Sequence, residues 1–237
     1  LAQSDIVSRY SNATFIVFRK APSLGQRINA LANECVATYF LVTRTDVDIE
    51  IFNCIKDFRS SQNTVLITPL VFNSEHELIP TVRAPHIERK EIDSLSFLPS
   101  KGKDENLYPF LGLGLYNRSL FQKLRGYDEE IKGAYWQLLD FGTRCWLYGY
   151  NIYSVNSMVI SFPNRQSLME DRSECEGIER FYTKALCVTM SRNGTPKVNK
   201  AYRTDKKFLL SEVKPRANLY KNDFQSLCAF WKNPDKD

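Results

Sequence analysis

The chain has 237 residues, 43% of them hydrophobic, and a formal net charge of +5. This composition suffices for a real core, and neither a signal-peptide pattern nor a run of about 18 uncharged apolar residues is present, so we expect a cytoplasmic protein without a transmembrane helix. Two histidines and six scattered cysteines without a C-x-x-C pair argue against a zinc site, so the thiols should be reduced and carboxylates must hold any metal.

The first part of the chain predicts strands that alternate with a helix. Residues Thr14–Phe18 are β-branched and aromatic, which is typical of a buried strand. Ser23 and Gln26 have the spacing of a capping box, which predicts a helix that begins there. The continuous apolar run Tyr39–Val42 indicates a central strand covered on both faces, and strand, helix and strand together indicate a parallel unit. Residues 1–11 resemble the tail of a helix at best.

The same alternation continues to about residue 160. The segment 72–106 is rich in prolines and charges, which is typical of loops or of an acceptor-side insertion. Gly149 is a natural stop for the strong helix that precedes it. The predicted elements are a helix over 51–58, strands over 64–68 and 111–116, a helix near 120–124, a helix over 135–148 and a strand over 152–160.

The character of the sequence changes after Pro163. Residues 176–190 look helical, and the remainder is basic and poor in strand signals. We therefore divide the chain into a core, 1–165, and a basic, partly helical extension, 166–237. The extension is either a solvated tail or a surface for weak peripheral association with the inner face of a membrane. No nucleic-acid-binding motif is present, so we expect no nucleic-acid partner, and the oligomeric state stays open.

A pair of carboxylates follows the apolar strand. Asp46 and Asp48 lie in the segment T-R-T-D-V-D at the carboxyl end of that strand, where open α/β sheets bind their ligands. Two carboxylates at i and i+2 supply hard oxygen ligands for Mn²⁺ or Mg²⁺. Such an ion neutralises charge on a departing diphosphate. The pair alone is equally typical of a solvated turn, so its context decides between these interpretations.

The context is a resemblance in the neighbouring sequence. S-L-G-Q-R-I-N-A-L-A-N-E followed by Y-F-L-V-T-R-T-D-V-D resembles the donor-site segment of family 2 glycosyltransferases, which have the GT-A fold. The family's first nucleotide-binding strand is not recognisable in this chain. The resemblance implies that Asp46 and Asp48 bind the metal. For Arg27 it implies a contact with the nucleotide, and the alternative is that Arg27 is only a surface residue. It places the following residues at the nucleotide sugar: Gly25, Arg27, Asn29, Arg44 and Asp46.

A second segment resembles the acceptor side of the same family. G-L-G-L-Y-N-R-S-L-F-Q-K-L-R-G-Y-D-E-E, followed by Y-W-Q-L-L-D-F-G-T-R-C-W-L-Y-G-Y-N-I-Y, is similar to a block in which a helix leads to G-G-[FY]-D-E and a later helix ends in R-x-x-x-x-G-[YF]. The resemblance implies an acceptor site at Tyr135, Trp136 and Gln137. Aromatic rings there would pack on the C–H faces of a sugar, with core packing as the alternative.

The second segment also departs from the family. Inverting members carry an acidic pair near the start of the late helix, and one carboxylate of the pair is the general base. Gln137 and Leu138 stand there in this chain. Asp140 is the carboxylate that remains, and an i,i+4 helix pair with Arg144 is its alternative role. Two further candidates for the base, or for caps of the preceding turn, are Asp128 and Glu129.

These observations predict an α/β protein of the GT-A (Rossmann-like) fold, with a mixed, mainly parallel sheet flanked by helices and a mostly helical C-terminal extension. The predicted function is metal-dependent, inverting transfer from a nucleotide-sugar donor, with UDP favoured, to a carbohydrate or lipid-linked acceptor. Phe162 and Pro163 stand where many relatives place a histidine ligand, so phosphate and water would complete the metal's coordination. One alternative is a decayed GT-A domain that binds carbohydrate or assists assembly. The other is a nucleotidyltransferase, which no Gly-rich phosphate loop supports.

Overall fold

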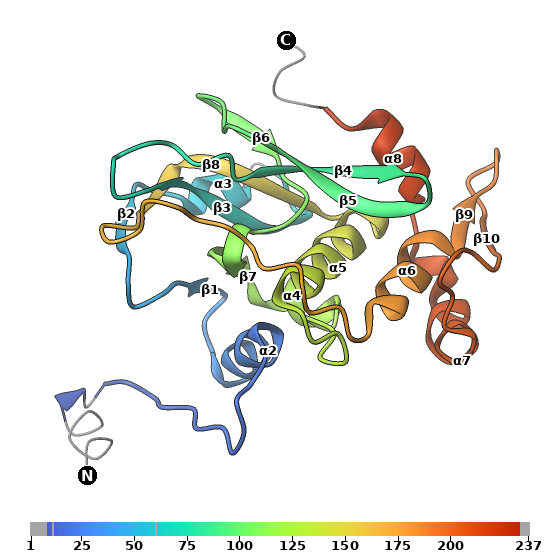
Figure 1. The fold of residues 1–237 in the computed structure, drawn as a ribbon, viewed down its shortest axis with the longest axis horizontal. Coiled ribbons are helices and arrows are strands. Elements are labelled where there is room, and N and C mark those ends of the chain that lie inside the picture. The colour runs from blue at the N-terminus through green and yellow to red at the C-terminus, as the bar shows by residue number, and fades with distance from the viewer. Residues whose placement is uncertain (1–8, 11, 60, 233–237) are drawn as a thin grey trace.

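The computed structural model describes residues 9–10, 12–59 and 61–232. A curled, mixed sheet lies at the centre, with helices on both faces and a separate hairpin beside it (Figure 1). The six strands of the sheet are β1 (Tyr39–Val42), β2 (Asp48–Ile51), β3 (Thr64–Phe72), β6 (Lys103–Glu105), β7 (Gly114–Asn117) and β8 (Asn151–Ser161). Their order is β1-β7-β3-β8-β2, and β6 pairs with β8 outside this path.

The directions of the strands differ from the expectation. β3 and β8 are parallel, whereas the pairs β1–β7, β3–β7, β2–β8 and β6–β8 are antiparallel. The sheet is mixed, as predicted, but the expectation that it is mainly parallel is wrong for the described strands. β1 is an edge strand rather than a central one, and the connection 43–47 leads from it to β2 at the opposite edge. An apolar run predicts that a strand forms, but it does not predict which other strand pairs with it or its position in the sheet.

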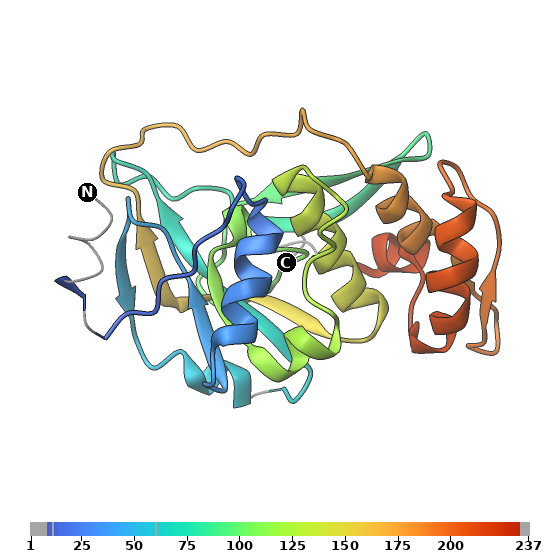
Figure 2. The ribbon, with the colours of Figure 1, turned by 90° about the horizontal axis from the view of Figure 1, so that it is seen from below.

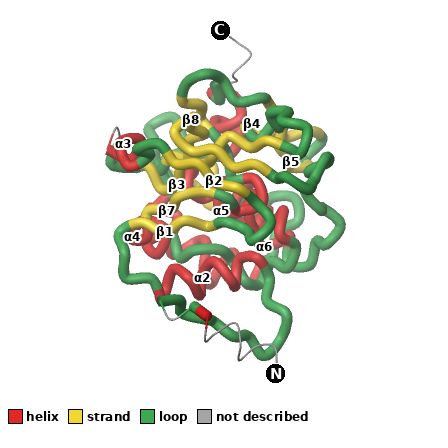
Figure 3. The backbone as a smooth tube through the Cα atoms, turned by 90° about the vertical axis from the view of Figure 1, so that its left-hand side faces the viewer, coloured by secondary structure: helices red, strands yellow, loops and turns green. Residues whose placement is uncertain are grey.

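Successive strand residues pack on opposite faces of the sheet, because the side-chain period of a strand is two. In β1, Phe40 joins the larger core, while Tyr39 and Leu41 pack with the smaller cluster that includes Phe58. The helices on the larger core include α2 (Leu24–Glu34), α4 (Arg118–Lys123) and α5 (Ala134–Leu147), and α3 (Ile55–Arg59) belongs to the smaller cluster. Figure 3 shows α2 and α5 together on one side of the strands.

The start of α2 is confirmed, whereas the strand expected before it is wrong. The hydroxyl of Ser23 accepts from the Gln26 N–H at 3.2 Å, and the Gln26 side chain accepts from the Ser23 N–H at 2.9 Å. This is the expected capping box. Residues Thr14–Phe18 form no strand, and Val17 is 82% exposed, because no described strand pairs with them. The expectation for residues 1–11 falls mostly on residues outside the described ranges.

The segment 72–106 is more regular than its composition indicated. It contains the antiparallel hairpin of β4 (Val82–Glu88) and β5 (Glu91–Phe97), followed by β6. The helix expected over 51–58 is shorter, because Ile51 pairs with Met158 as the last residue of β2. A short 3-10 turn, η1 (Phe110–Gly112), precedes β7. The strand expected over 111–116 therefore begins only at Gly114.

The helix α5 forms as predicted and lies almost entirely inside the molecule. It ends at Leu147, and Gly149 follows with a φ of 79°, a left-handed conformation that favours glycine. A Cβ on Gly142 would lie 2.0 Å from the carbonyl oxygen of Leu107, so no larger residue fits at this contact. The burial of α5 makes it the element against which both halves of the chain pack.

The C-terminal part is mostly helical, as expected, with one small hairpin. Phe181, Phe208 and Phe224 join the same core as Phe141 of α5, and the division at residue 165 stays a prediction. Among the described helices, none is long and apolar enough to cross a membrane. All six cysteines are free, and Cys175 is exposed. The elements are α6 (Ile178–Leu186), β9 (Val188–Met190), β10 (Pro196–Val198), α7 (Lys206–Phe208), η2 (Leu209–Val213), η3 (Lys214–Leu219) and α8 (Phe224–Phe230).

Candidate active site

The two aspartates of the D-x-D segment lie where the chain passes from β1 to β2. Asp46 accepts from Arg44 Nε at 2.8 Å and Nη2 at 3.0 Å, and its Oδ2 lies 2.6 Å from Nη2 of Arg165. These guanidinium groups, that of Arg44 first, hold the pKa of Asp46 well below its ordinary value. Asp48 is exposed at the start of β2, opposite Ser161. The structure therefore brings Arg44 and Asp46 together and adds Arg165 to them, while their contact with a nucleotide sugar stays a prediction.

The carboxylates of Asp46 and Asp48 are of the ligand type that divalent cations prefer, although Asp46 is already paired with Arg44 and Arg165. Carboxylate oxygens suit Mn²⁺ and Mg²⁺, and these ions keep several waters or phosphate oxygens as ligands. Within the described ranges, no group of three or more His, Cys, Asp or Glu side chains is placed to hold a metal. A cation bound by Asp46 and Asp48 would therefore have no third His, Cys, Asp or Glu ligand among the described residues. It would also compete with two guanidinium groups for Asp46.

Gly25 and Gln137 join the first turn of α2 to that of α5. The Gly25 N–H donates to Oε1 of the buried Gln137 at 2.8 Å, and Gln137 Nε2 donates to Ser23 Oγ at 2.9 Å and to the Ile131 carbonyl at 2.7 Å. A Cβ on Gly25 would lie 2.7 Å from Cβ of Tyr127 and 2.9 Å from Nε2 of Gln137. The close helix contact thus explains the glycine, and the amide of Gln137 is fully used within the protein.

Asn29 completes the same joint. Its amide donates to the Tyr127 carbonyl at 2.9 Å and to Glu129 at 2.8 Å, and its Oδ1 accepts from the Tyr127 N–H at 2.9 Å. The spacing of Gly25 and Asn29 therefore serves the packing of α2 on the turn before α5. Arg27 lies on the exposed side of α2, away from this joint. The structure brings Gly25, Asn29, Glu129 and Gln137 together and leaves Arg27 apart.

Asp128 and Asp140, two of the candidate bases, are both bound to cations. Lys184 Nζ lies 2.7 Å from Asp128 and 2.5 Å from Asp140. Asp128 also accepts from Arg180 at 3.0 Å, and Asp140 accepts from Arg144 at 2.9 Å. Burial alone raises the pKa of Asp128, but Lys184 and Arg180 more than offset this, so the pKa lies below its ordinary value. Asp140 is fully buried, and its i,i+4 pair with Arg144 is the alternative role foreseen from the sequence.

Tyr135 and Trp136 lie in the first turn of α5 beside a carboxylate that the sequence does not single out. The Tyr135 hydroxyl donates to Asp93 of β5 at 2.9 Å, and the Arg172 guanidinium lies 4.4 Å from the centre of the Tyr135 ring. Asp93 is half exposed, and Arg172 is bonded to it at 2.8 Å. The indole N–H of Trp136 is buried without a partner among the described residues.

The segment that connects β8 to α6, residues 162–177, ties these places together. It runs along one edge of the molecule (Figure 2). Arg165 pairs with Asp46, Arg172 pairs with Asp93, and Glu170 pairs with Arg83 at 3.0 Å. Burial raises the pKa of Glu170, and Arg83 opposes the rise. No spacing in the sequence connects these charged residues, since their partners lie 79 to 119 positions earlier in the chain.

The comparisons with known proteins agree with the fold. No protein-family model matches the chain, and no curated protein matches it. A solved structure of GalNAc-T7 with UDP, GalNAc and Mn²⁺ is similar, with a TM-score of 0.65 and 13% sequence identity. The match covers 97% of this chain and 47% of that chain, so the chain spans about half the length of GalNAc-T7. The likeness shows a GT-A glycosyltransferase fold, while membership of family 2 stays a prediction.

Proposed function

We propose that the chain is a glycosyltransferase that takes its sugar from a nucleotide-sugar donor, with UDP as the favoured nucleotide. The observation that carries the proposal is the likeness to GalNAc-T7 over 97% of the chain. The D-x-D segment adds support, because Asp46 lies in the connection that leaves the carboxyl end of β1 and Asp48 is the first residue after that connection, at the start of β2. Ligands of open α/β sheets bind at such ends.

The donor diphosphate is placed beside Asp46 in this proposal. Asp46 and Asp48 would hold Mn²⁺ or Mg²⁺, and the bound ion would supply positive charge to the departing diphosphate. Arg44 and Arg165 have planar guanidinium groups that match phosphate oxygens. Once either of them leaves Asp46, it can bind the diphosphate directly. Gly25 and Asn29 contribute to the donor site indirectly, because their hydrogen bonds hold α2 in place. Arg27 is the exposed residue of α2 that lies nearest to them in the sequence.

The acceptor is placed at the first turn of α5. Tyr135 and Trp136 would present aromatic surface to a sugar, and Gln137 would position this turn through its bond to Gly25. An acceptor of carbohydrate or lipid-linked type needs a base for inverting transfer. Glu129 is exposed, unlike the other two candidates from the sequence, and Asp93 joins it because its half-exposed carboxylate accepts from Tyr135.

Calorimetry with UDP, GDP and TDP, each with and without Mn²⁺, tests the donor site. We expect one nucleotide to bind and Asp46→Asn to weaken its binding. The control Asp171→Asn removes an exposed carboxylate elsewhere and should change nothing. If none of the nucleotides binds under either condition, the proposal fails. The anomeric configuration of the product, read by NMR, then separates inverting from retaining transfer.

A second candidate function rests on Gln137. This residue stands where inverting relatives carry an acidic pair, and its amide is fully bonded inside the protein. The same fold would then serve as a carbohydrate-binding or assembly module without transfer. Such a module would bind glycans while leaving the nucleotide sugar intact. Turnover that Asp93→Asn or Glu129→Gln abolishes, with folding unchanged, would contradict it.

A further inference from the structure

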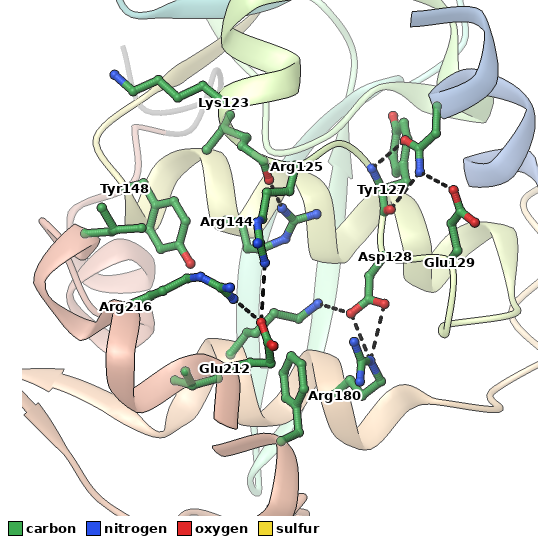
Figure 4. Close-up of a pocket in the computed structure, with 16 residues that line it drawn as sticks. Lys123, Arg125, Tyr127, Asp128, Glu129, Arg144, Tyr148, Arg180, Glu212 and Arg216 are labelled. Carbon is green, nitrogen blue, oxygen red and sulfur yellow. Dashed lines mark hydrogen bonds and ion pairs between the residues drawn. The ribbon is translucent and has the colours of Figure 1, made fainter. Parts of the chain in front are cut away.

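A cavity of about 360 Å³ lies between the turn before α5, the helices α5 and α6, and the segments η2 and η3 (Figure 4). Its lining includes neither the residues around Asp46 nor the pair of Asp93 and Tyr135. A volume of this size is typical of sites for small molecules, which range from roughly 300 to 1,000 Å³. The cavity therefore lies apart from Asp46 and from Asp93, although Glu129, a candidate base for transfer, is among its lining residues.

Positive charge predominates in this cavity. The Glu212 carboxylate forms an ion pair with Arg125, whose Nη1 lies 3.3 Å from Oε2, and a second ion pair with Arg216 (Figure 4). One carboxylate is thus shared by two guanidinium groups. Asp128 likewise serves both Arg180 and Lys184. Six cationic and three acidic side chains line the cavity, and Asp140, which is paired with Lys184, adds a fourth carboxylate. The net charge of these groups is therefore 6 − 4 = +2. The cations are Lys123, Arg125, Arg144, Arg180, Lys184 and Arg216, and the carboxylates are Asp128, Glu129, Asp140 and Glu212.

Most of the cationic groups have a partner within the protein before any ligand binds. The Arg180 guanidinium lies 4.0 Å from the centre of the Phe208 ring, which fixes its plane. Lys184 is buried between its two carboxylates. Arg125 and Arg216 reach Glu212 from different segments, the turn after α4 and η3. Fixed guanidinium groups recognise phosphate without a further loss of side-chain entropy.

One part of the lining is mainly apolar. Phe208, Val213, Leu219 and the ring of Tyr148 form this part of the wall. An inorganic ion would leave this surface in contact with water, whereas a phosphate ester with an apolar or ring-shaped body would cover it. The cavity thus matches a ligand with two parts, a dianionic head and an organic body.

We propose that this cavity binds a small phosphate monoester at a site separate from the donor edge. Its phosphate group lies between Arg125, Arg180 and Arg216, and its body packs on Phe208. The charge of the phosphate equals the excess of +2 in the cavity. None of the residues that would contact the phosphate or its body belongs to the Asp46 edge, although Glu129, a candidate base for transfer, also lines the cavity.

Phenyl phosphate is the probe, since it joins a dianionic group to one apolar ring. Calorimetry on the whole chain should show binding of phenyl phosphate, weaker binding of inorganic phosphate and none of phenol. The double variant Arg125→Gln/Arg216→Gln should bind phenyl phosphate at least about tenfold more weakly, because it removes two charge-assisted contacts. The matched control Arg89→Gln/Arg192→Gln removes two exposed guanidinium groups outside the cavity and should bind like the wild type.

Two results would overturn the proposal. One is phenyl phosphate binding that is absent at millimolar concentration or unchanged in Arg125→Gln/Arg216→Gln. The other is displacement of phenyl phosphate by UDP, which would make the cavity part of the donor site. Unfolding temperatures of all variants show whether a loss of binding is only a loss of folding. Failure of nucleotide binding with intact phenyl phosphate binding would count against the transferase alone.

Discussion

Replacement of Asp140 by asparagine separates a structural role of this residue from a catalytic one. The carboxylate is fully buried and lies 2.9 Å from Arg144 Nε and 2.5 Å from Lys184 Nζ. Removing one member of a buried ion pair costs roughly 3–5 kcal/mol, because the remaining charge is left without compensation. In Asp140→Asn, Lys184 would still form its ion pair with Asp128. Arg144 would still donate hydrogen bonds to the carbonyls of Leu124 and Gly126, both at 2.6 Å. We therefore expect a loss of about 3 kcal/mol, at the low end of that range.

Urea unfolding followed by tryptophan fluorescence measures this loss. Domains of this size have a free energy of unfolding of about 5–15 kcal/mol, so a decrease of about 3 kcal/mol is a large fraction of it. The unfolding temperature should fall by roughly 6–12 °C. The control Asp171→Asn changes an exposed carboxylate that accepts from the Ser173 N–H, and its effect should stay within about 0.5 kcal/mol. Unchanged stability of Asp140→Asn would refute the reasoning, and a loss of transfer at unchanged stability would make Asp140 catalytic.

Three further changes test the joint, the donor edge and the charge cluster. Gly25→Ala should lower the free energy of unfolding by about 1–3 kcal/mol through overpacking. The control Gly102→Ala should have little effect, because its added Cβ would lie 3.8 Å from its nearest neighbour, Ser100 Oγ. Equal urea midpoints of the two variants would contradict this expectation. Arg165→Gln should tighten Mn²⁺ binding severalfold, measured by the EPR signal of the free ion, because Asp46 loses a competing cation; weaker binding would count against Asp46 as a ligand. The lowered pKa of Asp128 stabilises the fold above its unfolded value of about 3.9, and this stability is lost as the pH falls toward the folded pKa. The stabilities of the wild type and Asp128→Asn should thus differ at pH 7 and begin to converge only below about pH 4, and urea midpoints that differ equally at every pH would refute the assignment.

The sequence by itself determined the elements whose signals are local. The capping box at Ser23 and the stop at Gly149 set the limits of α2 and α5, because both depend on residues within a few positions of the helix end. The apolar run Tyr39–Val42 predicted β1 for the same reason, whereas β2, which begins at Asp48, was not predicted. The GT-A fold was also predicted, since two motif segments in the expected order cover most of the core.

Only the tertiary structure decided which groups meet across the chain. The direction of β1 depends on its partner β7, whose paired residues lie 72 to 78 positions later, and an apolar pattern holds no information on a partner that far away. The same holds for Gln137, which bonds to Gly25 112 positions earlier. Lys184 joins Asp128 to Asp140, and the segment after β8 carries Arg165 to Asp46. A charged side chain gains its role from the partner that folding brings to it, and here that partner lies on another element of the fold.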